Sequence, residues 1–116
     1  RKNMPIHITE QVHNNSIISG SGDTLFLKGE IDDVDPGLFL TDFFRQARDQ
    51  MDETIRIDFT GLNFLNSSGI KCIVTFVMEK SPDTKIVFVT DSSKTWQRTS
   101  LEVIQSLDED NIAIEE

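Results

Sequence analysis

The sequence predicts an α/β fold in which strands and helices alternate around a small, mixed, mostly parallel sheet. Apolar side chains alternate with polar ones at Ile55, Ile57 and Phe59, which is the period of a strand. From Ile70 onward they recur at three and four residues, which is the period of a helix. Later segments repeat this change of period, and strand–helix units of this kind build parallel sheets. At this length we expect one domain, residues 1–116.

The first part of the chain predicts two strands joined as a hairpin, which makes the sheet mixed. Residues 6–12 carry alternating apolar side chains, and Ile17-Ile18 is expected to continue this strand after a break. Residues 19–23 have the composition of a turn. Leu25 and Leu27 then begin the second strand, so residues 1–23 are expected to form a strand and a turn.

Two helices are predicted around the central strand. The first spans residues 36–51, with Asp35 as its cap and Pro36 at its first position. Its apolar face contains Leu40, Phe43 or Phe44, Ala47 and Met51. After the central strand, Gly61 breaks the run, and Leu62, Phe64 and Leu65 predict a connecting loop held against the core.

The second helix spans residues 68–80 and is apolar nearly all round, which indicates deep burial or a second face for a partner. Residues 86–89 are an uninterrupted apolar run, which is typical of a strand covered on both faces. A third helix follows, capped by Asp91 or Ser92 and interrupted near Thr99-Ser100. Residues 112–114 predict a short last strand.

Composition excludes several classes of function. The net charge of −9 disfavours nucleic acid and anionic membrane surfaces as partners, because both require clustered Lys and Arg. No apolar run approaches the roughly 18 residues of a membrane helix, and no signal peptide is recognisable. Cys72 is the only cysteine, which fits a reducing cytoplasm and a small core residue. His7 and His13 are expected at the surface, with no metal site.

A cluster of short polar residues, Asn66, Ser67 and Ser68, lies where the second helix begins. Their side-chain oxygens can accept hydrogen bonds from the free N–H groups of the first turn, so a purely structural cap is one interpretation. The other is a phosphorylation switch, because a phosphate at a helix N-terminus meets free N–H donors and the positive end of the helix dipole. A partner docked there would meet the added charge of about −1.5 to −2.

Three stretches of the chain resemble the STAS family of the anti-sigma factor antagonist type. The central one is Asp58-Phe-Thr-Gly-Leu-Asn-Phe-Leu-Asn-Ser-Ser-Gly-Ile70, similar to the family pattern Asp-Leu-Ser-Gly-Val-x-Phe-(Ile or Met)-Asp-Ser-(Ser or Thr)-Gly-Leu. Upstream, Leu27-Lys-Gly-Glu-Ile-Asp32 resembles Leu-x-Gly-Glu-Leu-Asp. A weaker third match is Ile86-Val-Phe-Val-Thr-Asp-Ser-Ser93. The resemblance implies a STAS-like sheet with helices packed mainly on one side.

The resemblance also implies a function without catalysis. The unphosphorylated domain would bind an anti-sigma factor that is also a serine kinase and so release a sigma factor. The kinase would use ATP to phosphorylate Ser68, with Ser67 as the fallback, and a PP2C-type phosphatase would reset the switch. Asn66 to Gly69, with Glu30 and Asp32, would form the partner surface, and no cofactor is needed.

One residue departs from the family pattern, which has Asp where this chain has Asn66. Asn can still cap the helix, but it brings no charge next to the phosphate, so the switch or its partner can differ. The alternative is a STAS regulatory domain of an anion transporter or sensor assembly, binding a nucleotide or lipid. The missing starting Met keeps it open, because the chain can be cut from a longer protein.

Catalysis and metal binding are disfavoured by what the sequence contains. No Ser-His-Asp arrangement, phosphate-binding glycine loop or metal motif is present. Glu30, Asp32 and Asp58 offer carboxylates for acid–base chemistry, but nothing in their spacing pairs them. The acidic run from Glu30 to Asp35 lacks the calcium-loop pattern and is equally well explained as a solvated loop.

Overall fold

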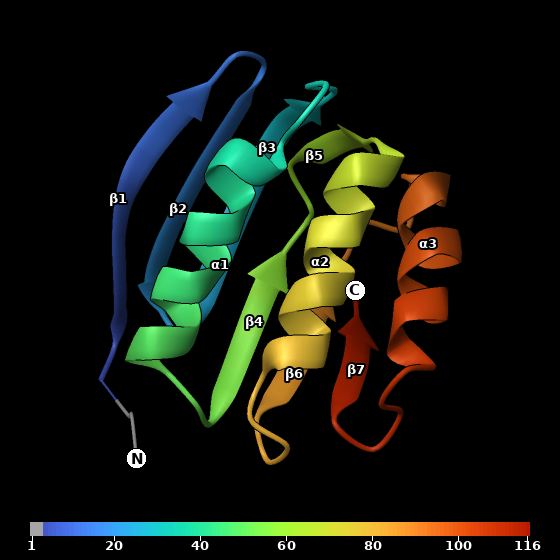
Figure 1. Cartoon of the computed structure of the whole chain (residues 1–116). Helices are drawn as coiled ribbons and strands as arrows, with labels where there is room; N and C mark the ends of the chain where they lie inside the picture. The colour runs from blue at the N-terminus through green and yellow to red at the C-terminus, as the bar shows by residue number, and fades with distance from the viewer. Residues whose placement is uncertain (1–3) are drawn as a thin grey trace.

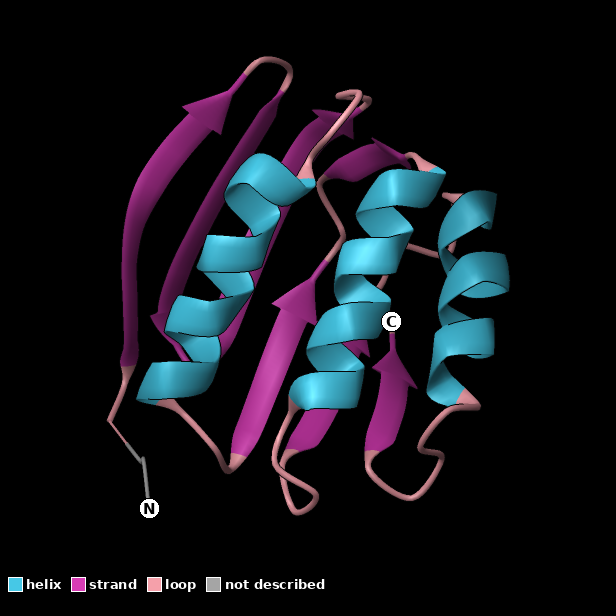
Figure 2. Cartoon of the chain, in the orientation of Figure 1, coloured by secondary structure: helices cyan, strands magenta, loops and turns pink. Residues whose placement is uncertain are grey.

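A computed structural model describes residues 4–116 as one mixed sheet of seven strands with three helices. All three helices lie on the same face of the sheet, as Figures 1 and 2 show. The strands are β1 (Ile6–His13), β2 (Ser16–Gly22), β3 (Thr24–Ile31), β4 (Thr54–Asp58), β5 (Leu62–Leu65), β6 (Lys85–Val89) and β7 (Ile112–Glu115). The helices are α1 (Gly37–Gln50), α2 (Ser67–Glu79) and α3 (Thr95–Gln105).

The sheet combines an antiparallel and a parallel half, in the order β1-β2-β3-β4-β6-β7. β1, β2 and β3 pair antiparallel as consecutive hairpins, whereas β3, β4, β6 and β7 run parallel. β3 pairs with β4 along residues 24–26 and with β5 along residues 29–31. Because helices connect the parallel strands, the C-terminal ends of β3, β4, β5 and β6 lie on the same side of the molecule (Figure 1).

The core lies between the helices and the sheet. The predicted apolar face of α1 is confirmed, since Leu40, Phe43, Phe44 and Ala47 are buried. On α2 the buried residues are Gly69, Ile73, Phe76 and Val77. The rings of Phe44 and Phe76 stack with centroids 4.9 Å apart, which joins the two helices. In β6, Ile86 and Phe88 pack in this core, while Val87 is 9% exposed although no helix covers its face.

The predicted turn at residues 19–23 is wrong, because Ser16–Gly22 forms a complete strand between β1 and β3. Small residues occur in this strand because neighbouring side chains pack closely against it, and not because the chain turns there. A Cβ atom on Gly20 would lie 2.7 Å from Cγ2 of Ile6, so only glycine allows β1 and β2 to keep this contact. The chain reverses instead at Asp23, between Gly22 with a φ of 66° and Thr24.

The other differences concern the ends of elements. Residues 62–65 are a strand and not a loop, because β5 continues the pairing of β3 beyond the end of β4. Leu62 and Leu65 are buried as expected, but Phe64 points outward and is 48% exposed. The predicted caps of α1 and α3 are also wrong, since neither helix has a side-chain cap and α3 is not interrupted.

At both edge strands of the sheet, β1 and β7, some of the outward-facing backbone groups are already hydrogen-bonded. At β1, the side-chain Oε1 of Gln50 accepts from the backbone N–H of His7 at 2.7 Å, and its Nε2 lies 3.5 Å from the carbonyl oxygen of His7. A shift of register between Ile8 and Gln11 follows along the same strand. At β7, Ile112 donates to the carbonyl of Asp108 and accepts from Gln105.

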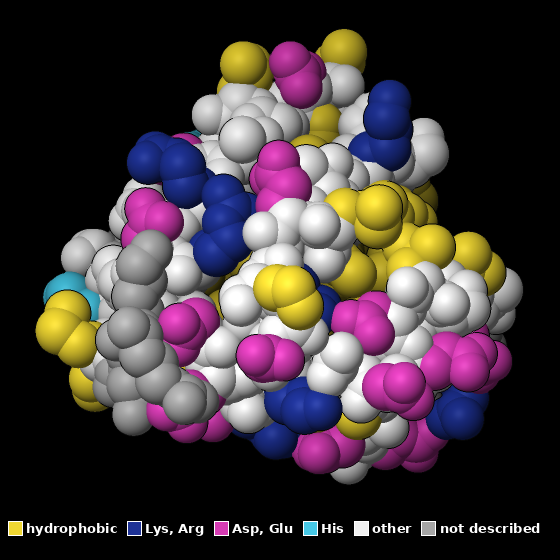
Figure 3. All heavy atoms as spheres, turned by 60° about the horizontal axis from the view of Figure 1, so that its bottom comes forward, with side chains coloured by type: hydrophobic (Ala, Val, Ile, Leu, Met, Phe, Trp, Pro, Cys, Tyr) yellow, Lys and Arg dark blue, Asp and Glu magenta, His cyan; other side chains and the backbone are white. Residues whose placement is uncertain are grey.

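The surface reflects the composition. Figure 3 shows acidic side chains spread across the end of the molecule that lies at the bottom of Figure 1, with basic ones between them. Among the helices of residues 4–116, none combines the length and apolar character that a bilayer crossing requires.

Candidate functional site

Asn66 forms the predicted cap of α2. Its backbone is extended, and its side-chain Oδ1 accepts a hydrogen bond of 2.8 Å from the N–H of Gly69. The carbonyl of Asn66 accepts from Ile70 at 3.0 Å, which begins the regular pattern of the helix. The helix therefore starts where the change of period predicted it, within one residue of the expected boundary.

The other end of the Asn66 amide makes a contact that the sequence does not reveal. Nδ2 donates to the carbonyl oxygen of Asp33 at 2.7 Å, and the backbone N–H of Asn66 donates to Ile31 at 3.0 Å. Asn66 thus joins the start of α2 to the loop between β3 and α1. An aspartate has an acceptor for Gly69 but no donor for Asp33, so the departure from the STAS pattern has a structural role in this chain.

The two serines differ in exposure. Ser67 is exposed at the first position of α2, whereas Ser68 is half-buried and faces a groove between α1 and α2. Both lie in the first turn, where backbone N–H groups lack helical partners. The structure therefore brings Asn66, both serines and Gly69 together as expected, with Ser67 the more accessible of the two hydroxyls.

The groove beside Ser68 is narrow and partly charged. Its volume is about 240 Å³, below the roughly 300 Å³ at which small-molecule sites usually begin. Arg48, at one end, lies 3.5 Å from Glu79. Cys72 lines the groove and is half-buried; burial, with the nearby charge of Asp35, raises the pKa of its thiol. A neutral, partly covered thiol is a poor nucleophile, which agrees with a packing role for Cys72.

The loop residues Glu30 and Asp32 lie beside this helix start. Glu30 is paired in register with Phe64, and Ile31 with Leu65. Asp32 is exposed, and its carboxylate receives hydrogen bonds of 3.4 Å from Asn15. Within residues 4–116, no hydrogen bond or ion pair joins Glu30 or Asp32 to the serines. The structure thus places them at the same end of the molecule without direct contact.

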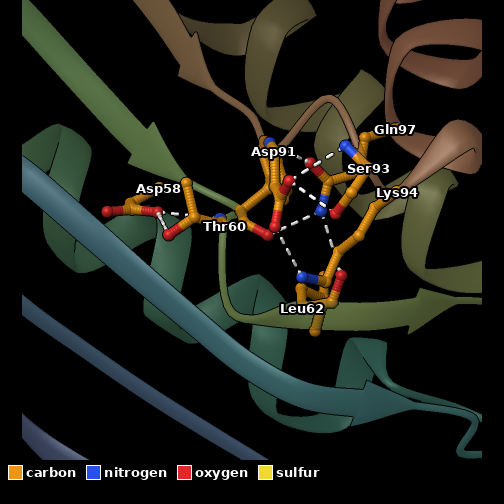
Figure 4. Close-up of polar contacts among 8 residues, drawn as sticks. Asp58, Thr60, Leu62, Asp91, Ser93, Lys94 and Gln97 are labelled. Carbon is orange, nitrogen blue, oxygen red and sulfur yellow. Dashed lines mark hydrogen bonds and ion pairs between the residues drawn. The ribbon is translucent and has the colours of Figure 1, made fainter. Parts of the chain in front are cut away.

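A second polar cluster, at the C-terminal ends of β4 and β6, connects the loops that follow these strands (Figure 4). The buried side chain of Gln97 donates to the carbonyls of Phe59 and Leu62, at 2.6 and 3.0 Å, and accepts from the N–H of Asp91 at 2.9 Å. Hydrogen bonds from Lys94 and Ser93 lower the pKa of Asp91 to about 2. These groups satisfy one another, so the cluster holds the connections after β4 and β6 in place.

The carboxylates considered for acid–base chemistry are not assembled. Asp58 accepts from both the N–H and the hydroxyl of Thr60, at 2.8 and 2.6 Å. Of the histidines, His7 is exposed, and the ring of His13 stacks on Phe39 with centroids 4.2 Å apart. In the described part of the chain, no three residues of the metal-binding types form a group that could hold a metal ion.

Sequence reasoning missed several exposed apolar residues at this end of the molecule. Phe64 is next to the helix start, and Val34 and Leu38 lie on the far side of the loop that Asn66 holds. In the sequence they are indistinguishable from core residues, because exposure depends on which face the tertiary structure leaves uncovered.

Comparison with known proteins finds a likeness in structure but not in sequence. No family model and no curated protein sequence matches the chain significantly. The crystal structure of an anti-sigma factor antagonist from Mycobacterium paratuberculosis aligns with a TM-score of 0.59 and 18% sequence identity, over 85% of this chain and 79% of that one. The chain therefore has the STAS-like fold that its motifs predict, that of an anti-sigma factor antagonist.

Proposed function

We propose that the chain is a binding module switched by phosphorylation, in the manner of anti-sigma factor antagonists. The observation that carries this proposal is the presentation of Ser67 and Ser68 in the first turn of α2, at an exposed end of a protein with this fold. Asn66 caps the turn without the serine hydroxyls, so these remain free for modification.

The physics of the helix start explains how such a switch would work. Free N–H groups and the helix dipole stabilise a phosphate at this position, so modification leaves the domain folded. A partner docked over the same turn would bury a charge of about −1.5 to −2. Burying an unpaired charge costs several kcal/mol, which is enough to prevent binding.

The partners follow from the same proposal. In its unmodified form the module binds an anti-sigma factor with serine-kinase activity, and this releases a sigma factor. The kinase transfers phosphate from ATP to Ser68, and a PP2C-type phosphatase removes it. The module itself catalyses no reaction and acts in the cytoplasm. Glu30 and Asp32 contribute to the docking surface beside α2.

The test is incubation of the chain with the candidate kinase and ATP, followed by intact-mass analysis. We expect one phosphate on the wild type and on Ser67→Ala, and none on Ser68→Ala. Ser67 is the more exposed hydroxyl, so phosphate retained by Ser68→Ala and lost by Ser67→Ala would move the site by one residue. An unmodified wild type would reject the switch.

Binding of the kinase provides the second measurement. Ser68→Asp is expected to fold like the wild type, judged by urea unfolding, and to lose most of its affinity for the kinase. Ser92→Asp is the matched control, because Ser92 is an exposed serine just before α3. Equal affinity of both variants and the wild type would refute the charge-block mechanism.

A further inference from the structure

An apolar groove lies between the tip of the β1–β2 hairpin and the start of α1, on the far side of the β3–α1 loop from Ser68. We call it the hairpin groove. Its volume is about 600 Å³, and it is lined by Val12, His13, Asn14, Asp33, Val34, Asp35, Leu38 and Phe39. Val34 is 98% exposed, Leu38 83% and Val12 68%. Large aliphatic side chains exposed together on one concave surface indicate a contact site.

The walls of the hairpin groove are held in place by polar contacts. The amide of Asn14 donates to the carboxylate of Asp33, and the N–H of Glu30 donates to the carbonyl of Asn15 at 2.9 Å. Gly29 allows this close approach, since its φ is 87° and a Cβ atom there would lie 2.2 Å from the oxygen of Asn15. The hairpin tip and the loop therefore form one preformed surface.

The charged side chains that line the hairpin groove are carboxylates. Asp33 and Asp35 line it, and Asp32 lies beside them on the same loop. Within residues 4–116, none of these three carboxylates forms an ion pair, and no Lys or Arg lines the groove. Carboxylates without a basic partner, next to exposed apolar side chains, favour a binding partner that brings apolar groups and positive charge together.

We propose that the hairpin groove is a docking site for a segment of a partner protein with apolar side chains flanked by Lys or Arg. A second copy of the chain fits poorly, because it has 11 basic residues against 20 acidic ones and a net charge of −9. An anionic membrane is disfavoured by the same charge. The site requires no modification of Ser68, so binding there can be measured independently of the proposed switch.

The test uses a defined probe, a short synthetic peptide with leucines at i and i+4 flanked by lysines, in the spacing of helix-in-groove recognition. A second peptide has glutamate in place of every lysine. Each is titrated into the isotopically labelled, unphosphorylated chain and followed by two-dimensional NMR. We expect the lysine peptide to bind at least about tenfold more tightly, which is about 1.4 kcal/mol. Its shifts should centre on Val12, Val34, Leu38 and Phe39.

Two variants make the result decisive. Leu38→Glu is expected to lose at least about tenfold in affinity for the lysine peptide, whereas Val103→Glu should bind like the wild type. Val103 is the control because it is 67% exposed on α3, away from the groove. Binding should also weaken at high salt, where the Debye length falls to about 3 Å.

Three results would overturn the proposal: no shifts, shifts centred on other elements, or equal affinity for the two peptides. The switch is tested separately, because these titrations involve no kinase and no phosphate. A chain that no kinase modifies can still pass this test, and failure here leaves Ser68 as a candidate acceptor.

Discussion

Replacing Asn66 with Asp restores the residue of the STAS pattern and separates the two roles of this side chain. A carboxylate can still accept from Gly69, as Oδ1 does now at 2.8 Å. It cannot donate to the carbonyl of Asp33, which Nδ2 now contacts at 2.7 Å. We therefore expect the variant to keep its helix start and to loosen the attachment of the β3–α1 loop.

The expected change in the free energy of unfolding follows from two opposing effects. Leaving a partly buried carbonyl without its donor costs roughly 1–3 kcal/mol. A negative charge at the N-terminus of α2 returns about 0.3–1 kcal/mol, reduced here by the acidic loop beside it. The expected net destabilisation of Asn66→Asp is about 1–2 kcal/mol. Asn66→Ser keeps a cap but loses the donor to Asp33 and gains no charge, so it should lose about 1–3 kcal/mol; Asn66→Ala, which loses both contacts, should lose about 2–4 kcal/mol.

Urea unfolding measures these differences, since a domain of this length is expected to unfold in two states. With a slope of about 2 kcal/mol per molar, in the middle of the usual range for urea, the midpoint for Asn66→Asp should fall by about 0.5–1 M. An unchanged slope would show that the unfolded state is unaffected. If Asn66→Asp is as stable as the wild type while Asn66→Ala is not, the contact with Asp33 contributes nothing and the reasoning is wrong.

Three further predictions concern residues that hold loops in place. Gly29→Ala should destabilise the chain by about 3 kcal/mol or more in urea, because it adds a clash with Asn15 to strain at positive φ; Gly22→Ala, with a φ of 66° and open space around it, should lose only about 1 kcal/mol. Gln97→Met removes three hydrogen bonds to the backbone, although the carbonyl of Phe59 keeps its bond from the N–H of Leu62. It should lose about 2–3 kcal/mol, and a loss below about 1 kcal/mol would count against the cluster's role. The pKa of Asp91 is lowered to about 2 in the folded state, so its contribution to stability is present above about pH 4 and is lost as the pH falls toward 2. In Asp91→Asn the free energy of unfolding should depend less on pH between about 4 and 2. The same pH dependence as in the wild type would contradict this.

The helices and the parallel strands other than β5 could be predicted because their apolar patterns are local. The face of α1, for example, is visible in the spacing of Leu40, Phe43 and Ala47 alone. β2 could not be recognised, since Ser19-Gly-Ser-Gly22 has the composition of a turn and its strand depends on two neighbours that pair with it. Gly20 is small because Ile6 fills the space above it, which is a tertiary fact.

The candidate site was predictable to a similar degree. Asn66, Ser67 and Ser68 were located at the helix start because capping depends on short-range geometry. The bond from Asn66 to Asp33 spans 33 positions in the chain, and the sequence has no local signal for it. The hairpin groove was invisible for the same reason, because Val12 and Leu38 come together only through the folded hairpin.

The amide of Gln50 at the outer strand has a consequence for assembly. It hydrogen-bonds the backbone N–H and carbonyl of His7, the groups that a strand from another molecule would pair with. The irregular pairing between Ile8 and Gln11 interrupts the rest of this edge strand. Exposed edge strands can pair with other chains, which leads to domain swapping and aggregation. Contact with other proteins at this strand is then left to side chains, which can discriminate between partners as a bare backbone cannot.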